Sequence, residues 1–335
     1  MQKASLNKLA ILNKLVTAAP AIVPSGELVE SLNVSRQAIW KGIESLREET
    51  IGIESLPNRG YRFISPPTFD LSPTWLEHRL QGTSLGHPIL FFETVDSTQE
   101  IAKEAARRGM PAGLVVLSEE QRAGRGRMGR TWLSPTGGNL YASLLLRPRI
   151  SPMQIQLVNL AAGLAVQMAL ESLFRVRCSL KWPNDLLWKG RKLCGILSET
   201  ASETDRVHFA VTGIGLNVNM SVRDLISAGA ENPCSLIEIR NETSNRGEIL
   251  VEILRRISEL IGLLEAGPEG VQRLVALYRQ RCSTLGKEVR VLTDSGTDYG
   301  IAENITQDGA LEVNVQGSLR VYTAADVLHV RASQD

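Results

Sequence analysis

The hydrophobic pattern of the first 65 residues changes from helical to alternating. Apolar residues between positions 6 and 16 recur three or four positions apart, which predicts a first helix. A short second helix is predicted to begin at Ser25, and a third, capped by Ser35, follows a turn at Asn33-Val34. Apolar and polar residues then alternate on both sides of a Pro-Asn-Arg-Gly turn at 57–60, which indicates a β-hairpin. This order of elements predicts a winged helix-turn-helix domain over residues 1–65.

A small three-helix packing domain is the alternative for this segment, and Trp40 suits either an apolar core or a DNA contact. Residues 1–65 contain eight Lys and Arg against six Asp and Glu, a net charge of +2. So small a charge supports only weak non-specific binding. Recognition of DNA therefore implies a dimer that reads two half-sites.

The centre of the chain has the pattern of an α+β domain. Residues 66–84 begin with two prolines and are interpreted as a linker. Residues 85–283 alternate between strand and helix patterns, and 247–282 are predicted to be helical. Four strands in quick succession between 180 and 217 favour hairpins over parallel crossovers, so a mixed or antiparallel sheet is expected.

The pattern changes again towards the end of the chain. Residues 220–245 predict an irregular loop segment. Residues 286–335 contain short strand patterns separated by glycine-containing turns, which predict a small SH3-like β-barrel. The expected fold class is α+β with three units.

Composition excludes several classes of protein. The 335 residues include 37 Lys and Arg against 36 Asp and Glu, so any nucleic-acid role must lie in a local patch. Four widely spaced cysteines without a CxxC pair argue against a zinc site or a disulfide framework. The most apolar stretch, 155–174, is interrupted by polar residues and is a poor membrane span. A cytoplasmic protein without a membrane partner is expected.

The most informative motif is the arginine–glycine loop, which we define as residues 121–132. Three glycines within six residues allow the backbone to approach a ligand closely, and four arginines supply donors for phosphates and carboxylates. A flexible basic surface loop or an RNA-binding segment is the alternative. The loop lacks the Walker A pattern and matches GxGxxG only by letter spacing.

A second motif is Lys-Trp-Pro-Asn-Asp at 181–185, followed by a strand that begins near Lys192. A turn between the two strands is expected to bring Asp185 close to Lys192. A carboxylate for a metal and an ammonium for developing negative charge suit nucleotidyl transfer. The alternative is an ordinary surface salt bridge. Cys194 is interpreted as a packing residue rather than a nucleophile.

The third motif, Asp96-Ser97-Thr98-Gln99, opens a predicted helix. Ser97 is expected to cap it, with Glu100 three residues later as its capping-box partner. Hydroxyl groups at a helix N-terminus also suit a polar ligand.

Taken together these motifs resemble the biotin–protein ligase family, in its bifunctional bacterial form that is also a biotin-operon repressor. The resemblance depends on VDST at 95–98, GRGRMGR at 124–130, KWPND at 181–185 and KLCGIL at 192–197, in that order. It implies a class II synthetase-like central domain that uses MgATP to form biotinyl-5′-adenylate and then biotinylates a lysine of biotin carboxyl carrier protein. It also implies an adenylate-loaded homodimer that binds operator DNA, and a C-terminal domain that assists ATP use.

The resemblance further implies a set of site residues, named here by their positions in this chain. Lys192, Arg125, Arg127 and Asp185 would be catalytic, with Asp185 also linked to Mg²⁺. The biotin site would be Ser97, Thr98, Gln99, Gln121, Gly124, Arg125, Gly126, Arg127, Lys192 and Gly195. The ATP site would be Arg127, Arg130, Trp132, Lys181, Asn184 and Asn217. The DNA contacts would be Gly26, Ser35, Arg36, Gln37, Trp40, Lys41 and Arg59.

Three rival interpretations stay open at this point. A lipoate–protein ligase belongs to the same superfamily, although the arginine–glycine loop argues against it. The chain could also be a ligand-sensing transcription factor without ligase activity, or a ligase whose helix-turn-helix no longer regulates. Gln99 stands where well-known repressor-type members carry Asn, which puts that one contact in question.

Overall fold

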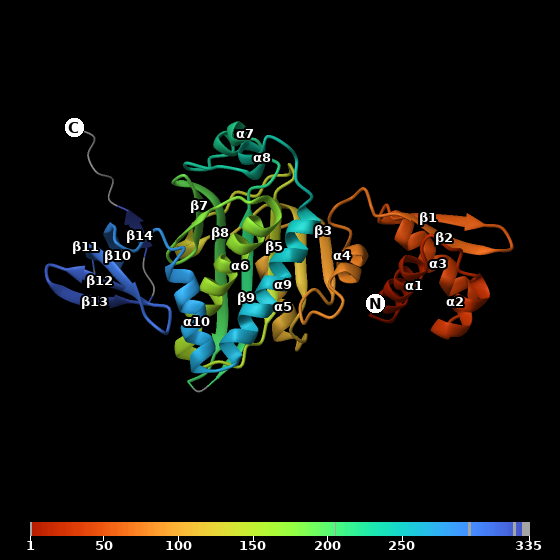
Figure 1. Ribbon diagram of the computed structural model, residues 1–335, viewed down its shortest axis with the longest axis horizontal. Helices are drawn as coiled ribbons and strands as arrows, with labels where there is room; N and C mark the ends of the chain where they lie inside the picture. Colours follow the sequence, from red (N-terminus) through yellow and green to blue (C-terminus); the bar gives the residue numbers. More distant parts are fainter. Residues whose placement is uncertain (1, 205, 294–295, 324–325, 330–335) are drawn as a thin grey trace.

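The computed structural model describes residues 2–204, 206–293, 296–323 and 326–329. Figure 1 shows three units along the long axis of the molecule, with the N-terminal helices and the C-terminal strands at opposite ends of a central α+β body. The expected α+β class and the order of the units are therefore observed.

The N-terminal unit is a bundle of three helices with a hairpin. Helices α1 (Gln2–Ala18), α2 (Ser25–Leu32) and α3 (Arg36–Glu48) precede strands β1 (Gly52–Leu56) and β2 (Gly60–Ser65). The Ser35 hydroxyl accepts a hydrogen bond from the Ala38 amide at 3.2 Å, so the predicted cap of α3 is confirmed. Helix α2 begins at Ser25 as predicted, but Ser25 is not its cap, because Pro24 occupies the N-cap position.

The predicted linker contains a helix with buried residues. Helix α4 (Pro73–Arg79) begins at a proline in its first turn, where the missing N–H costs no hydrogen bond. Leu71, Leu76 and Leu80 belong to the core of the central body. Proline here starts a helix rather than an extended tether.

The central body contains a seven-stranded mixed sheet in the order β3-β4-β5-β9-β8-β7-β6. Strands β3 and β4 are parallel and the other neighbours are antiparallel, as expected from the rapid succession of strand patterns. The strands are Ile89–Val95, Val115–Gln121, Leu140–Leu146, Val207–Leu216, Arg191–Ser202, Asp185–Trp188 and Ser179–Lys181 in that spatial order.

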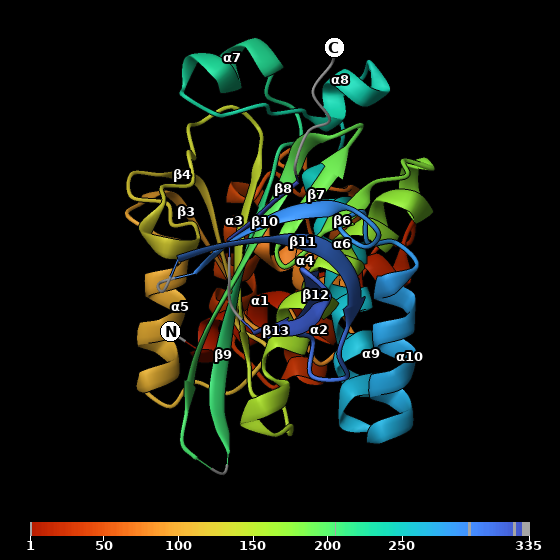
Figure 2. The ribbon, with the colours of Figure 1, turned by 90° about the vertical axis from the view of Figure 1, so that its left-hand side faces the viewer.

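Helices cover both faces of this sheet (Figure 2). Helix α5 (Thr98–Arg107) packs on one face, whereas α6 (Gln156–Phe174), α9 (Arg246–Glu265) and α10 (Pro268–Arg279) form a layer on the other. Helix α6 is long and apolar enough to cross a membrane by composition, but 72% of its span is buried inside the protein. It is therefore interpreted as the core helix of the central body.

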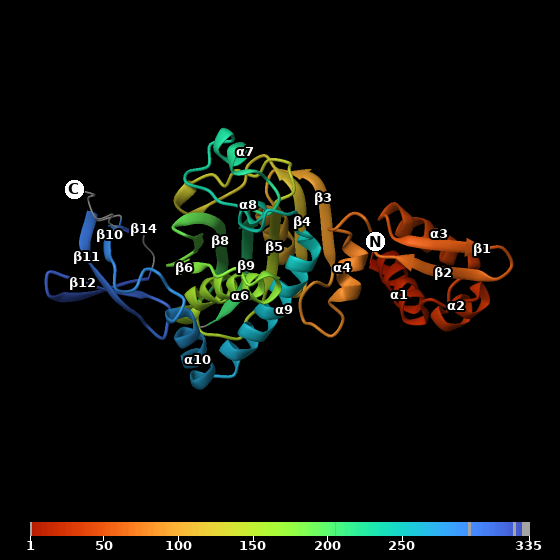
Figure 3. The ribbon, with the colours of Figure 1, turned by 45° about the horizontal axis from the view of Figure 1, so that its top comes forward.

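Two elements differ from the sequence expectations. Gly267, with a φ of +99°, divides the helical stretch 247–282 into α9 and α10. The segment expected to be irregular at 220–245 contains helices α7 (Val222–Ser227) and α8 (Leu236–Arg240), which lie together above the sheet in Figures 1 and 2; Figure 3 turns this end of the molecule towards the viewer. Short apolar patterns of five or six residues are too brief to reveal such helices.

The C-terminal unit is a five-stranded antiparallel sheet in the order β13-β12-β11-β10-β14. Its strands are β10 (Glu288–Thr293), β11 (Gly296–Ile305), β12 (Leu311–Val315), β13 (Ser318–Tyr322) and β14 (Asp326–His329). Strand β14 is absent from the sequence prediction. In the described parts of this unit β13 and β14 remain separate edges, so a closed barrel is not observed.

Candidate active site

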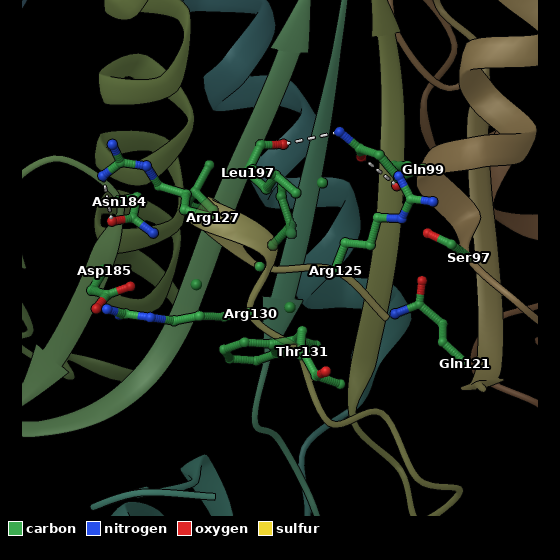
Figure 4. Close-up of a pocket in the computed structure, with 18 of the residues that line it drawn as sticks. Ser97, Gln99, Gln121, Arg125, Arg127, Arg130, Thr131, Asn184, Asp185 and Leu197 are labelled. Carbon is green, nitrogen blue, oxygen red and sulfur yellow. Dashed lines mark hydrogen bonds between the residues drawn. The ribbon is translucent and has the colours of Figure 1, made fainter. Parts of the chain in front are cut away.

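A pocket lies where the arginine–glycine loop passes over the central sheet (Figure 4). One wall comes from the start of α5 and the end of β4, and the opposite wall from the β6–β7 turn and β8. Strand β14 of the C-terminal unit contributes Leu328. Segments far apart in the sequence thus converge on one cavity.

The floor of the pocket depends on two glycines that face each other across β8 and β9. Gly195 is paired with Gly215, and the indole of Trp132 packs closely over both. A Cβ atom at Gly215 would lie 2.3 Å from the indole ring, and one at Gly195 would lie 2.8 Å from it. Only glycine allows this close approach, so the predicted site residue Gly195 is part of the floor.

A chain of hydrogen bonds continues along the floor towards α5. The Thr98 hydroxyl lies 2.8 Å from the Ser143 hydroxyl, which donates to the side-chain oxygen of Gln99 at 3.1 Å. The Gln99 amide nitrogen donates to the backbone carbonyls of Leu197 and Val211, at 3.2 and 2.9 Å. The side chain of Gln99 therefore ties α5 to the sheet. The longer amide of Gln99 makes this connection between α5 and the sheet.

Gln121, the first residue of the arginine–glycine loop, extends this series of hydrogen bonds. Its side-chain oxygen accepts from the Thr98 backbone amide at 3.0 Å, and its nitrogen donates to the Ser134 hydroxyl at 2.8 Å. Thr98 and Gln121 are therefore held in fixed orientations by hydrogen bonds within the protein.

The Ser97 hydroxyl has no hydrogen-bond partner among the residues that the structure describes. It is buried at the pocket wall, and although Ser97 occupies the N-cap of α5, its side chain makes no capping bond. The predicted capping box with Glu100 is therefore wrong. A buried hydroxyl without a partner costs free energy, about 1–3 kcal/mol, which a polar ligand would recover.

On the opposite wall Asp185 and Lys192 form the expected pair. The carboxylate of Asp185 lies 2.8 Å from the Lys192 ammonium, and the Asp185 side chain is only 15% exposed. The ammonium also lies 5.3 Å from the centre of the Trp132 ring. Because both residues line the pocket, this pair differs from the surface salt bridge considered as the alternative.

Arginine side chains surround the pocket entrance. Arg127 donates to the Asn184 side-chain oxygen at 3.5 Å, on the wall that also carries Lys181 (Figure 4). Arg125 extends to the other side of the loop, where its guanidinium lies 2.7 Å from the Glu100 carboxylate. Arg130 and Gly126 line the same entrance.

Two predicted site residues do not line the pocket. Asn217 is buried, and its amide donates to the Cys234 carbonyl at 2.9 Å, which fastens the segment before α8. Gly124 lies behind the pocket wall, where a Cβ atom would meet the Trp132 carbonyl at 2.3 Å. Cys194 is fully buried, and burial raises its thiol pKa well above the usual range, in agreement with a packing role.

The structure adds pocket residues that the motifs did not indicate. Ser143, Gly213 and Gly215 line the floor, and Leu328 comes from the C-terminal unit. Gly213 and Gly215 could have been recognised from the sequence, because a glycine inside an apolar strand often marks a place where another group packs closely on the backbone. Neither Ser143 nor Leu328 has any sequence signal, because only folding brings them to the pocket.

The predicted DNA contacts are all exposed residues of the N-terminal unit. Trp40 is 54% exposed, so the alternative of a core role is wrong. Gly26 lies near the start of α2, Ser35 caps α3, and Arg59 lies at the exposed tip of the hairpin. The remaining exposed contacts, all on α3, are Arg36, Gln37 and Lys41.

Comparisons with known proteins agree with this arrangement of units. Residues 91–217 match the biotin/lipoate A/B protein ligase family, residues 7–62 match an HTH domain, and residues 284–330 match the biotin protein ligase C-terminal domain. Among solved structures, the Aquifex aeolicus biotin protein ligase in complex with biotin and ATP aligns with a TM-score of 0.62 and 29% identity, covering 73% of this chain and 99% of that one.

Similar proteins extend over nearly the whole chain. The bifunctional ligase/repressor BirA of Bacillus spizizenii is 32% identical, covering 92% of this chain and 94% of that protein. The Escherichia coli protein of the same name is 27% identical over 90% of this chain and 92% of its own length. The biotin–[acetyl-CoA-carboxylase] ligase of Mycobacterium tuberculosis is 35% identical over 71% of this chain and 87% of that protein. The chain therefore belongs to the biotin–protein ligase family, in its bifunctional ligase/repressor group.

Proposed function

We propose that this protein activates biotin with ATP and transfers it to a lysine of a biotin carboxyl carrier protein, and that its adenylate-loaded form represses biotin genes. The observation that carries the ligase proposal is a single pocket with uncharged hydrogen-bonding groups at one end and the Asp185–Lys192 pair at the other. Biotin has the same polarity, with a neutral urea ring at one end and a carboxylate at the other.

At the neutral end, Ser97, Thr98 and Gln121 would bind the urea group. The Ser97 hydroxyl is buried and has no hydrogen-bond partner within the described part of the chain, and Thr98 and Gln121 are fixed by hydrogen bonds to each other. Gln99 has both functional groups of its amide engaged with Ser143 and with backbone carbonyls, so its proposed part in the biotin site is to shape the floor.

At the charged end, the biotin carboxylate would attack the α-phosphorus of ATP, forming the mixed anhydride and releasing pyrophosphate. Two anions approach each other in this step, and cations fixed in position lower its barrier. Lys192 and Arg127 would supply that charge, and Arg125 is the remaining catalytic candidate from the sequence. Arg130, Trp132, Lys181 and Asn184 would face the nucleotide. The carrier lysine then attacks the acyl carbon, and AMP leaves.

The residues present also fit a magnesium ion that arrives with ATP. Among the described residues that line the pocket, Asp185 supplies the carboxylate, and its Oδ1 atom lies 2.8 Å from the Lys192 ammonium. Among the described residues no cluster of three or more acidic, His or Cys side chains could hold a metal. A single carboxylate suits Mg²⁺, which takes most of its other ligands from phosphates and water. When bound, the ion would neutralise phosphate charge.

Biotin-dependent ATP–pyrophosphate exchange tests the ligase proposal. We expect exchange with biotin and not with lipoate, and a loss of about 100-fold or more in Lys192→Ala. Lys189→Ala is the matched control, because Lys189 is exposed on the turn between β7 and β8. Exchange with lipoate instead would assign the protein to the lipoate ligases, and no exchange with either would favour a sensor without ligase activity. Near wild-type exchange in Lys192→Ala would contradict the role of Lys192.

For the repressor part, we propose three domains, namely a DNA-binding domain at 1–65, a catalytic domain at 85–283 and an SH3-like domain at 286–335, with a connecting segment at 66–84 between the first two. We further propose a homodimer when adenylate is bound, in the cytoplasm. Gel shifts with the organism's own biotin-gene promoters, with and without biotin and ATP, test this. A shift that needs both ligands is expected, and is weakened by Lys41→Ala on the exposed face of α3. If no promoter fragment shifts, the repressor proposal fails and the protein is a ligase that does not regulate these genes.

A further inference from the structure

Glu100 in the first turn of α5 interacts with the arginine–glycine loop. Its Oε1 atom lies 2.7 Å from Nη1 of Arg125, and also 2.7 Å from the ammonium of Lys103 one turn later. The oxygen is buried beneath these two cations, although the Glu100 side chain as a whole is 37% exposed. The carboxylate therefore joins the loop to the helix.

The helix side of this contact is itself fixed to the sheet. Lys103 is only 12% exposed, and its ammonium lies 2.9 Å from the Glu199 carboxylate on β8. The hydrogen bond from Lys103 lowers the pKa of Glu100, and the charges of Lys103 and Arg125 add to this effect against the opposing influence of burial. Glu100 is thus a charged group in a connected network, which is stronger than an isolated surface pair.

The loop depends on side chains for its position over the pocket. Two backbone hydrogen bonds, both 2.9 Å, fasten its beginning to the end of β3. The Arg122 amide donates to the Val95 carbonyl, and the Ala123 amide donates to the carbonyl of Asp96, the residue after β3. Further along, the Gly126 amide donates to Arg130 within the loop at 2.7 Å. Within the part of the chain that the structure describes, the backbone hydrogen bonds of residues 125–130 stay inside the loop.

Two arginines extend from this outer part in opposite directions. Arg127 reaches Asn184 beside β7, and Arg125 reaches Glu100 on α5. Figure 4 shows the two side chains on opposite sides of the pocket. The loop therefore crosses the pocket between these two side-chain contacts. Arg127 meets a neutral amide at Asn184, whereas Arg125 meets a carboxylate at Glu100.

We infer that Glu100 is a positioning residue that holds the arginine–glycine loop closed over the bound adenylate through Arg125. This inference rests on the proposed function, because it takes biotinyl-adenylate as the bound ligand. It also changes the role of Arg125, whose guanidinium serves loop closure rather than stabilisation of charge on the reacting groups.

The test measures the dissociation rate of biotinyl-adenylate and the single-turnover rate of its formation in the full-length protein. Glu100→Gln and Arg125→Gln are each expected to increase dissociation about fivefold, the scale of a partly buried ion pair. The double variant should dissociate no faster than either single variant, because both break the same contact. In Glu100→Gln the rate of adenylate formation should stay within about twofold of wild type. Glu104→Gln is the matched control, since Glu104 lies on the same helix and pairs only with Arg107 and Arg108 among the described residues.

Salt provides a readout that a purely structural defect would not change. Raising the ionic strength should increase the wild-type dissociation rate towards that of Glu100→Gln and leave the variant nearly unchanged. Trypsin cleavage within the loop should also be faster in Glu100→Gln than in Glu104→Gln.

Two results would overturn the inference. One is wild-type dissociation in Glu100→Gln, and the other is a tenfold or larger loss of adenylate formation confined to Arg125→Gln, which would make Arg125 directly catalytic. If the wild type forms no adenylate, the proposed function fails. The trypsin comparison then still decides whether Glu100 holds the loop, with equal cleavage rates counting against it.

Discussion

The two outer units are joined to the central body by different kinds of contact. The C-terminal sheet shares one continuous apolar core with the central body, whereas the N-terminal unit has a separate core of its own. Leu328 of the C-terminal sheet lines the pocket, and none of the described pocket residues comes from the N-terminal unit. The difference indicates that one outer unit is part of the ligand site and the other is attached beside it.

Polar contacts dominate the N-terminal joint. The carboxylate of Glu49 at the end of α3 accepts hydrogen bonds from the Ser72 hydroxyl at 2.6 Å and the Thr74 amide at 2.9 Å, and it also pairs with Lys8 of α1. Trp75 of α4 stacks on Phe63 of β2. Burial opposes ionisation of Glu49, but Lys8 and the hydroxyl donors outweigh it and lower the pKa of the carboxyl.

A large aromatic side chain dominates the C-terminal joint. Trp182 of the KWPND motif is fully buried, and its indole N–H donates to the Gly309 carbonyl at 2.9 Å. Its backbone amide donates to the Thr284 hydroxyl at 3.0 Å, and Thr284 also contacts His329 of β14. The motif that carries Asp185 thus also positions the strand that supplies Leu328.

The largest expected effect is from Trp182→Ala. Removing this side chain leaves a cavity in the shared core and frees the Gly309 carbonyl, and we expect a loss of about 3–5 kcal/mol in the free energy of unfolding. Adenylation should fall with it, because β14 loses its support. Chemical denaturation and pyrophosphate exchange measure the two effects.

Trp188→Ala is the control, since Trp188 lies on the next strand but is only partly buried. It should cost clearly less stability and leave adenylation close to wild type. If Trp182→Ala unfolded the N-terminal unit first, the assignment of the two cores would be wrong.

A smaller effect is expected from Glu49→Gln, which breaks the other joint. The amide loses the pairing with Lys8 and at least one accepted bond, so we expect the N-terminal unit to lose about 1–3 kcal/mol of stability at neutral pH. Adenylation should remain unchanged and DNA binding should weaken. Thermal unfolding followed by circular dichroism in the helical region measures the stability difference.

The pH dependence of this difference follows from the lowered pKa. The stabilisation by ionised Glu49 is complete above its ordinary value of 4.5 and is lost as the pH falls through the lowered value. Wild type and Glu49→Gln should therefore converge at acid pH. Glu48→Gln, one residue earlier and exposed, should match wild type throughout. A constant gap between wild type and Glu49→Gln across this pH range would show that its charge is not the cause.

Much of the site could be predicted because its motifs are local. Asp185 and Lys192 lie on two strands joined by a tight turn, so proximity in the sequence ensured proximity in space. The prediction that Ser97 caps α5 was wrong, although serine is a common capping residue at the start of a helix. The local sequence does not show that its hydroxyl lacks a partner among the described residues. Asn217 was predicted at the ATP site but does not line the pocket, because its side chain follows the packed segment at Cys234, whose position the local sequence does not show.

The sequence by itself determined the order of the three units, most of the strands and the residues of the four motifs, since periodicity, turns and motifs are properties of neighbouring residues. Only the tertiary structure decided which outer unit reaches the pocket, which glycines support Trp132 and that Glu100 contacts Arg125. These contacts join residues that are distant in the chain. Their free energy comes from burial and charge pairing that exist only after the elements pack together.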